Sequence, residues 1–202
     1  METFQLEFDT KILEYEKQNR WGSAADYAFQ LWLDNPKNLN RLLCAGTQLW
    51  YTLLVLDDIK KDSLSLEESE LISETYLKKR LMKVTWFGFD HFPDDTVFNA
   101  YFGYMISLMP HFFCDYSGDY LGWQEKGNKM IRLSYIKNSD NLFAEALCFE
   151  LDDYVIGSPF YNTCKKIWTQ ITPEQWGCSE VQRYFFHILY GNLLCDRAGR
   201  EM

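Results

Sequence analysis

Residues 31–45 read LWLDNPKNLNRLLCA, and residues 133–147 read LSYIKNSDNLFAEAL. Both stretches place the pattern N-x-x-N-L between segments whose apolar residues recur every three or four positions. This spacing indicates amphipathic helices, and the Asn-Pro and Asn-Ser pairs favour a break between them. The two stretches therefore predict antiparallel helix hairpins that are joined by short turns.

The same helical spacing extends along the whole chain, and no segment has the alternation of a strand. We expect an all-α fold in a single helical domain over residues 1–202, with a flexible end at residues 199–202. Ser23 is a predicted N-cap, and Ser65 with Glu68 predicts a capping box. Eight to nine helices are expected, at about residues 3–18, 23–33, 39–55, 65–84, 94–108, 118–135, 142–154, 159–170 and 179–198.

The first hairpin resembles a tetratricopeptide unit, because SAADYAFQLWLDNPKN at residues 23–38 has small residues inside a helix and proline at the turn. Asn35 and Asn138 are separated by about three periods of the 34-residue tetratricopeptide repeat. The resemblance implies a TPR-like or irregular helical-repeat domain. The middle of the chain has no matching N-x-x-N-L, so the alternative is that both asparagine pairs serve only as helix breakers and caps.

Composition narrows the class of partner. The chain has 202 residues, a formal net charge of −9 and a sequence pI near 4.8, which argues against nucleic acid and anionic membrane surfaces as direct partners. Its most apolar stretch, residues 49–59, contains Asp57 and Asp58, and the N-terminus lacks a secretory signal pattern. The six cysteines show no CxxC spacing, as is typical of reduced, buried thiols. We expect a cytoplasmic protein.

Motifs for catalysis, cofactors and metals are absent from the sequence. No phosphate-binding glycine loop, nucleophile elbow or zinc spacing occurs, and the three histidines, His91, His111 and His187, have no helical partner at ligand spacing. We therefore expect no catalytic residues, no cofactor and no metal. A small helical enzyme with a carboxylate site remains an alternative, since converging acids leave no sequence motif.

Two tracts lack lysine and arginine. Between Lys83 and Lys126 the chain carries Asp90, Asp94, Asp95, Asp115, Asp119 and Glu125, and between Lys137 and Lys165 it carries Asp140, Glu145, Glu150, Asp152 and Asp153. The first tract interleaves acids with aromatic residues, as in WFGFDHFPDD and FFCDYSGDYLGW. This mixture predicts a negative recognition surface for a basic partner, with the lysines and arginines grouped elsewhere.

We predict that this partner docks chiefly between Trp86 and Trp123 and around residues 150–153. The competing interpretation is that the acids form solvated faces, while Trp86, Phe87 and Phe89 only pack one hairpin on the next. The predicted partner-binding residues are Asp90, Asp94, Asp95, Asp115, Tyr116, Asp119, Tyr120, Trp123, Glu150, Asp152 and Asp153.

In character the chain resembles immunity proteins of bacterial toxin systems, including contact-dependent growth inhibition, through base-free tracts such as DHFPDDTVF and CFELDDYVIGSPF. The resemblance implies a non-enzymatic inhibitor that blocks the active cleft of a basic, nuclease-type toxin, as a monomer or within a heterodimer. A TPR-like peptide adaptor, with Asn38, Asn141 and Asn192 as backbone clamps, is one alternative. A subunit whose aromatic patch forms a homo-oligomer is another.

Overall fold

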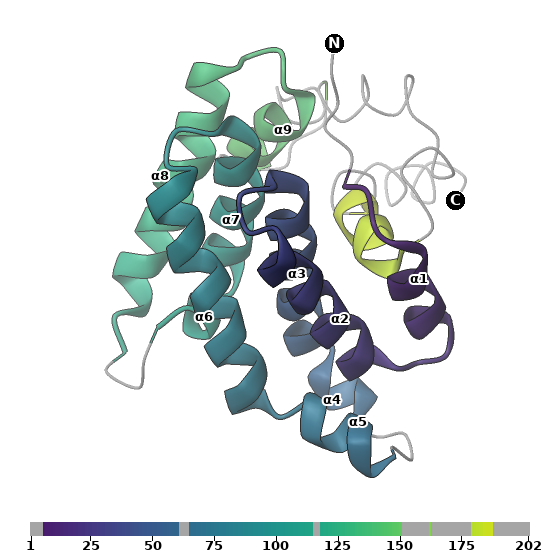
Figure 1. The fold of residues 1–202 in the computed structure, drawn as a ribbon. Coiled ribbons are helices and arrows are strands. Elements are labelled where there is room, and N and C mark those ends of the chain that lie inside the picture. The colour runs from purple at the N-terminus through teal and green to yellow at the C-terminus, as the bar shows by residue number, and fades with distance from the viewer. Residues whose placement is uncertain (1–5, 61–64, 115–117, 151–161, 163–178, 188–202) are drawn as a thin grey trace, which may run out of the picture.

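The computed structural model describes residues 6–60, 65–114, 118–150, 162 and 179–187. Within these ranges the regular structure is helical and contains no strands, which confirms the predicted all-α class (Figure 1). Residues 180–187 are helical as well. The elements are α1 (Thr10–Lys17), α2 (Trp21–Asp34), α3 (Leu39–Leu54), α4 (Leu56–Ile59), α5 (Leu66–Leu71), α6 (Glu74–His91), α7 (Thr96–Leu108), the 3-10 helix η1 (Pro110–Phe112), α8 (Tyr120–Lys137) and α9 (Leu142–Glu150).

The two N-x-x-N-L stretches form the same turn. Asn35 follows α2 and Asn138 follows α8, and their backbone angles are nearly equal (φ −147°, ψ 76° and φ −145°, ψ 80°). In each turn the N–H of the second asparagine donates to the carbonyl of the first across 3.1 Å. The side chains of Asn38 and Asn141 then cap α3 and α9. The internal similarity is therefore a repeated hairpin turn.

A related turn, with the same hydrogen bond but other backbone angles at Phe92 (φ −130°, ψ 35°), joins α6 to α7, where the sequence has no N-x-x-N-L. The N–H of Asp95 donates to the carbonyl of Phe92 across 3.1 Å, and Asp95 caps α7. Aspartate can replace asparagine here because both side chains accept from the N–H groups of a first helical turn. The caps at residues 38, 95 and 141 are unequally spaced and more than about 34 residues apart, so the helix packing is compatible with an irregular helical-repeat domain rather than with a strict tetratricopeptide period.

Some predicted helix boundaries were wrong. The expected helix over residues 65–84 is two helices, α5 and α6, which are separated at Ile72 and Ser73. Ser23 is not an N-cap, because α2 begins at Trp21 and Ser23 lies in its first turn. There the buried carboxylate of Glu68 accepts from the N–H groups of Gly22 and Ser23, at 3.0 and 3.3 Å. Tertiary contact thus supplies the cap that sequence reasoning assigned to Ser23.

The core lies around α3 and α7. Trp50 of α3 and Phe102 of α7 have no exposed surface, and Phe102 packs against Gly46. Most residues of α3 are buried, so this helix lies at the centre of the fold. Helix α6 packs against α3, and α8 packs along α7 (Figure 1). These contacts bring the start of α8 next to the outer face of α6.

Among the described residues, no helix combines the length and the apolar character that a membrane span requires. Of the cysteines that the structure describes, Cys44 and Cys148 are buried, as the sequence predicts, whereas Cys114 is only half-buried.

Candidate functional site

Asp90, Asp94 and Asp95, three of the predicted partner-binding acids, lie at the end of α6 and in the α6–α7 turn, whereas Asp119 lies at the opposite end of α8 from Lys137, the partner of Asp94. Asp95 caps α7 by accepting from the N–H groups of Val97 and Phe98, both at 2.9 Å. Asp119 caps α8 by accepting from the N–H of Gly122 at 3.0 Å, and Asp94 forms an ion pair with Lys137. Asp90 is exposed on α6. Three of these four carboxylates therefore already form hydrogen bonds or an ion pair with other residues of the chain.

Five other predicted residues fall, wholly or with their side chains, outside the described part of the chain. Asp115, Tyr116, Asp152 and Asp153 lie outside the described residues, and Glu150 ends α9 with a side chain that is not described. The expected flexible end at residues 199–202 also lies outside them.

Of the predicted aromatic residues, Trp123 packs against aromatic residues of α6, and Tyr120 is the first residue of α8. The ring centroids of Trp123 and Trp86 are 5.9 Å apart in an edge-to-face arrangement, and Phe89 stacks on Trp123 at 6.3 Å. Trp86 keeps 50% of its surface exposed and Tyr120 keeps 48%. The rings thus join α6 to α8, and part of the cluster stays exposed at the surface.

Lys126 of α8 covers this aromatic cluster. Its Nζ lies 3.4 Å from the ring centroid of Phe89, 5.2 Å from that of Trp86 and 5.1 Å from that of Trp123. Burial lowers the pKa of Lys126 below its ordinary value. Because the rings attract the ammonium group electrostatically, they stabilise its charge in this position.

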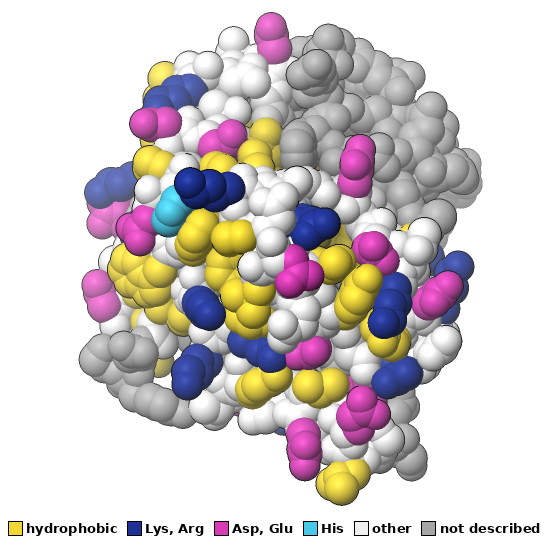
Figure 2. Space-filling model, in the orientation of Figure 1, with side chains coloured by type: hydrophobic (Ala, Val, Ile, Leu, Met, Phe, Trp, Pro, Cys, Tyr) yellow, Lys and Arg dark blue, Asp and Glu magenta, His cyan; other side chains and the backbone are white. Residues whose placement is uncertain are grey.

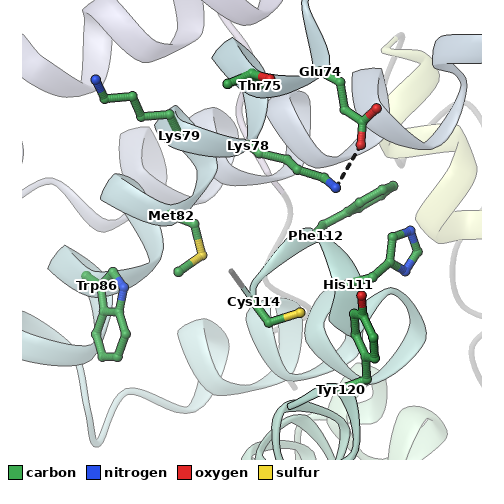
Figure 3. A pocket seen from close by; sticks show the side chains of 10 residues that line it. All are labelled: Glu74, Thr75, Lys78, Lys79, Met82, Trp86, His111, Phe112, Cys114 and Tyr120. Carbon is green, nitrogen blue, oxygen red and sulfur yellow. Dashed lines mark ion pairs between the residues drawn. The ribbon is translucent and has the colours of Figure 1, made fainter. Parts of the chain in front are cut away.

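A cavity of about 520 Å³ lies between α6, η1 and the start of α8, and we call it the α6–α8 cavity (Figure 3). Trp86 and Lys79 lie toward one end in this view, and His111 and Tyr120 toward the other. Hydrophobic side chains gather on the surface over α6, with lysine and arginine side chains between them (Figure 2). The cavity is lined by Glu74, Thr75, Lys78, Lys79, Met82, Trp86, His111, Phe112, Cys114 and Tyr120.

The α6–α8 cavity carries basic side chains, although a negative surface was predicted for the aromatic tract between Lys83 and Lys126. Nζ of Lys78 lies 2.7 Å from a carboxylate oxygen of Glu74, and Lys79 is exposed. Burial, helped by the charge of Lys78, lowers the pKa of His111 below its ordinary value of 6.5. At neutral pH the imidazole is therefore mostly uncharged. The cavity wall carries positive charge, although the sequence led us to expect the bases away from this tract.

Sequence reasoning missed Lys78, Lys79 and His111 as functional candidates, because it examined the base-free tract by itself. A signal for the lysines was present, since Thr75, Lys78, Lys79, Met82 and Trp86 follow one another at intervals of one, three and four residues. On a helix such positions share one face. His111 had no comparable signal, because its approach to α6 depends on the path of η1.

A second candidate site holds the chain's own N-terminal segment. Asn40 of α3 bonds both backbone groups of Glu7: its Oδ1 accepts from the N–H at 3.1 Å, and its Nδ2 donates to the carbonyl at 2.8 Å. The side chain of Gln182 donates to the carbonyl of Leu6, whose side chain is buried. Asn38 and Asn141, expected as clamps in the adaptor interpretation, are helix caps, and Asn192 lies outside the described residues.

Within the described part of the chain, no group of three or more histidine, cysteine, aspartate or glutamate side chains is placed to hold a metal ion. The chain matches no protein-family model, and searches of curated proteins and of solved structures find no significant relative.

Proposed function

We propose that this protein is a non-enzymatic, cytoplasmic inhibitor that neutralises a basic, nuclease-type toxin domain by binding it as a one-to-one complex. The docking face in this proposal comprises Trp86, Tyr120 and Leu121 with the neighbouring Asp90. The observation that carries the proposal is the exposure of these three large apolar side chains at one junction of helices, where α6 meets the start of α8.

Exposed aromatic anchors support a protein interface at this junction. Large apolar groups that are about half exposed or more lose water when a partner covers them, and tryptophan and tyrosine are enriched among the residues that dominate binding energy. The ring of Trp86 packs edge-to-face against Trp123 and Phe89, and these contacts fix its position before a partner binds. A fixed anchor lowers the entropy that association costs.

The net charge of the whole chain supports a basic partner, whereas Lys79 and Lys126 place positive charge beside Trp86 at the docking face itself. With a formal net charge of −9, the protein attracts a cationic domain over a distance of about one Debye length, roughly 8 Å at physiological salt. Attraction of this kind accelerates encounter more than it strengthens the final complex. We therefore expect the association rate to fall as salt concentration rises, while the dissociation rate changes little.

The experiment begins with capture of partners from the source cells on the purified, full-length protein. A captured basic protein is then assayed for nuclease activity with increasing amounts of this protein. The expected result is complete inhibition at a molar ratio of one. A partner that has no nuclease activity, or that keeps its activity when saturated, would contradict the inhibitor proposal.

Matched variants locate the face. Leu121 and Leu66 are both 79% exposed, but Leu66 lies on α5, away from the α6–α8 junction. Leu121→Asp places a charge among the proposed apolar contacts and is expected to weaken binding at least tenfold, or about 1.4 kcal/mol. Leu66→Asp adds the same charge elsewhere and is expected to leave affinity unchanged. Equal effects of the two substitutions would rule out the proposed face.

A peptide-binding adaptor is a second candidate, and the contacts of Asn40 with Glu7 favour it. Main-chain bonds from a side-chain amide hold an extended segment whatever its sequence, while a buried side chain such as Leu6 supplies selectivity. In this proposal a partner's segment with an apolar residue at the Leu6 position replaces the chain's own segment.

The test of this second candidate uses the full chain and a labelled peptide, LEFDTKIL, which corresponds to residues 6–13. Leu6→Asp weakens the hold on the chain's own segment, so this variant is expected to bind the peptide while the wild type does not. Adding Asn40→Ala should abolish binding, since it removes both bonds to the peptide backbone. Binding that survives Asn40→Ala would contradict the proposal.

A further inference from the structure

Trp86, Phe89 and Trp123 form an aromatic cage, and the ammonium group of Lys126 occupies it. The ring centroids of Phe89 and Trp123 lie 5.5 and 5.9 Å from that of Trp86. The Lys126 Nζ lies 3.4, 5.2 and 5.1 Å from the ring centroids of Phe89, Trp86 and Trp123. All three distances fall within the range of about 6 Å over which an aromatic face attracts a cation. The cage thus holds a cation in this structure, and that cation belongs to the chain itself.

Lys126 has no carboxylate partner in the described part of the chain. The neighbouring Glu125 pairs with Lys129 instead, at 2.7 Å, and Lys126 forms no ion pair with any described residue. Burial lowers the pKa of Lys126, because the half-buried ammonium loses water without gaining a carboxylate. Since a lysine side chain is long and flexible, the ammonium group can leave the cage for solvent without breaking an ion pair.

The cage is open to solvent at Trp86. This ring keeps 50% of its surface exposed. It also lines the α6–α8 cavity, where it lies toward one end in Figure 3. Open space therefore adjoins the cage, and a ligand group can reach the rings once Lys126 withdraws.

The chemistry of the cage favours an alkylated ammonium ion over a primary one. A primary ammonium is strongly hydrated, and the rings do not replace the hydrogen bonds that its three N–H donors make in water. A trimethylammonium group has no N–H donor, and its methyl groups cover more ring surface. An anion is disfavoured, because aromatic faces are negative and the formal net charge of the chain is −9.

We propose that the cage of Trp86, Phe89 and Trp123 binds a trimethylammonium group, which displaces the Lys126 side chain into solvent. Choline and trimethylated lysine side chains both carry this group. The inference does not rest on the proposed inhibitor function, because it concerns a ligand of the isolated protein.

The test titrates the full-length protein with choline and follows the indole N–H signals of Trp86 and Trp123 by nuclear magnetic resonance. The matched ligand is 3,3-dimethylbutan-1-ol, which has the shape of choline and no charge. Choline is expected to bind at least about threefold more tightly than this alcohol, because the rings attract only the charged ligand. Lys126→Ala removes the resident ammonium and should tighten choline binding about fivefold to tenfold. Lys129→Ala removes an equal charge from an exposed position of α8 and should have little effect.

Two substitutions of Trp86, made in the Lys126→Ala protein, test the part played by the ring. Trp86→Phe keeps an aromatic face and should retain part of the choline affinity. Trp86→Leu removes the aromatic face and should weaken choline binding further, by about threefold or more relative to Trp86→Phe. An unchanged helical circular dichroism spectrum shows that each variant is folded.

Four results would overturn the proposal: no detectable choline binding to Lys126→Ala, equal affinity for choline and its uncharged isostere, equal tightening by Lys129→Ala, or unchanged affinity after Trp86→Leu. N-acetyl-trimethyl-lysine amide distinguishes the two sources of the group. Tighter binding of this compound than of choline would assign the group to a protein side chain, and the reverse order would assign it to a free small molecule. Inhibition of a toxin is measured with a different partner and with Leu121→Asp, so failure of one proposal leaves the other standing.

Discussion

Ser179 donates a hydrogen bond from Oγ to Oε1 of Glu16 across 2.9 Å, so a residue of α1 holds the start of a helix near the other end of the chain. The N–H of Glu180 donates to the second carboxylate oxygen, also at 2.9 Å. Glu16 is 5% exposed. A buried carboxylate therefore supplies acceptors for the first turn of residues 180–187, which lie beside α1 in Figure 1.

This contact predicts a pH-dependent contribution to stability. Burial raises the pKa of Glu16 above its ordinary value of 4.5, although the bonds from Glu180 and Ser179 act in the opposite direction. Between pH 4.5 and the raised pKa, the folded protein holds this proton while the unfolded chain releases it. The contribution of Glu16 to stability is therefore largest below pH 4.5 and falls as pH rises through that window.

The side chain introduced by Glu16→Gln has no ionisable group. The difference in unfolding free energy between the wild type and this variant therefore isolates the contribution of Glu16 protonation to stability. Urea denaturation at intervals from pH 4.5 to pH 7.5 should show the wild type losing stability relative to the variant as pH rises. Glu14→Gln on the exposed side of α1 serves as the control and should give no such trend. A difference that stays flat or grows with pH would contradict the assignment.

Glu68 is the second buried glutamate that caps a distant helix. Its carboxylate accepts from the N–H groups of Gly22 and Ser23 and forms an ion pair with Arg20 at 3.3 Å. Glu68→Ala leaves these donors without an acceptor, so we expect it to lower the unfolding free energy by about 2–3 kcal/mol. Glu67→Ala, at the exposed neighbouring residue, should cost less than about 0.5 kcal/mol. Chemical denaturation of both variants checks the contrast, and similar losses would be inconsistent with it.

The Ser65–Glu68 pair shows what local sequence can and cannot predict. The expected cap of Ser65 on the N–H of Glu68 is present at 3.2 Å. The other half of the box is not formed, because the Glu68 side chain is bound at the start of α2. The three-residue spacing of Ser65 and Glu68 predicts hydrogen bonds within one helical turn. The Glu68 carboxylate instead accepts hydrogen bonds from residues more than forty positions away in the sequence. For the same reason the aromatic residues Tyr120 and Trp123 were predicted, while Lys78 and Lys79, which line the α6–α8 cavity together with Tyr120, were not.

The three hairpin turns give a prediction about capping. Alanine at position 38, 95 or 141 removes a side-chain acceptor from the first turn of α3, α7 or α9, and each change should lower stability by about 1 kcal/mol. Asn38→Asp should be nearly neutral because Asn38 is exposed. Asn141→Asp should cost more, because Asn141 is 4% exposed and the substitution buries a charge. Thermal denaturation of the variants ranks them, and equal melting temperatures for both Asp substitutions would count against this account.

Gly127 allows the close packing of α7 and α8, which positions the start of α8 against α6. A Cβ atom at Gly127 would lie 2.5 Å from the backbone nitrogen of Ser107 and 2.7 Å from the carbonyl oxygen of Gly103. Backbone atoms of a packed helix cannot yield as a flexible side chain can, so Gly127→Ala must separate the helices. The cost of overpacking, about 1–3 kcal/mol, should exceed the gain of up to about 1 kcal/mol in helix propensity.

Gly127→Ala is therefore expected to lower the melting temperature, whereas Gln124→Ala, at an exposed position of α8, should have little effect. Separation of α7 and α8 would also move Trp123 relative to Trp86, so the tryptophan emission spectrum of Gly127→Ala should change in the folded state. Gly127→Ala with wild-type stability and emission would show that α7 and α8 tolerate the additional methyl group. The position of the aromatic cluster would then be set by its ring contacts rather than by the approach of these two helices.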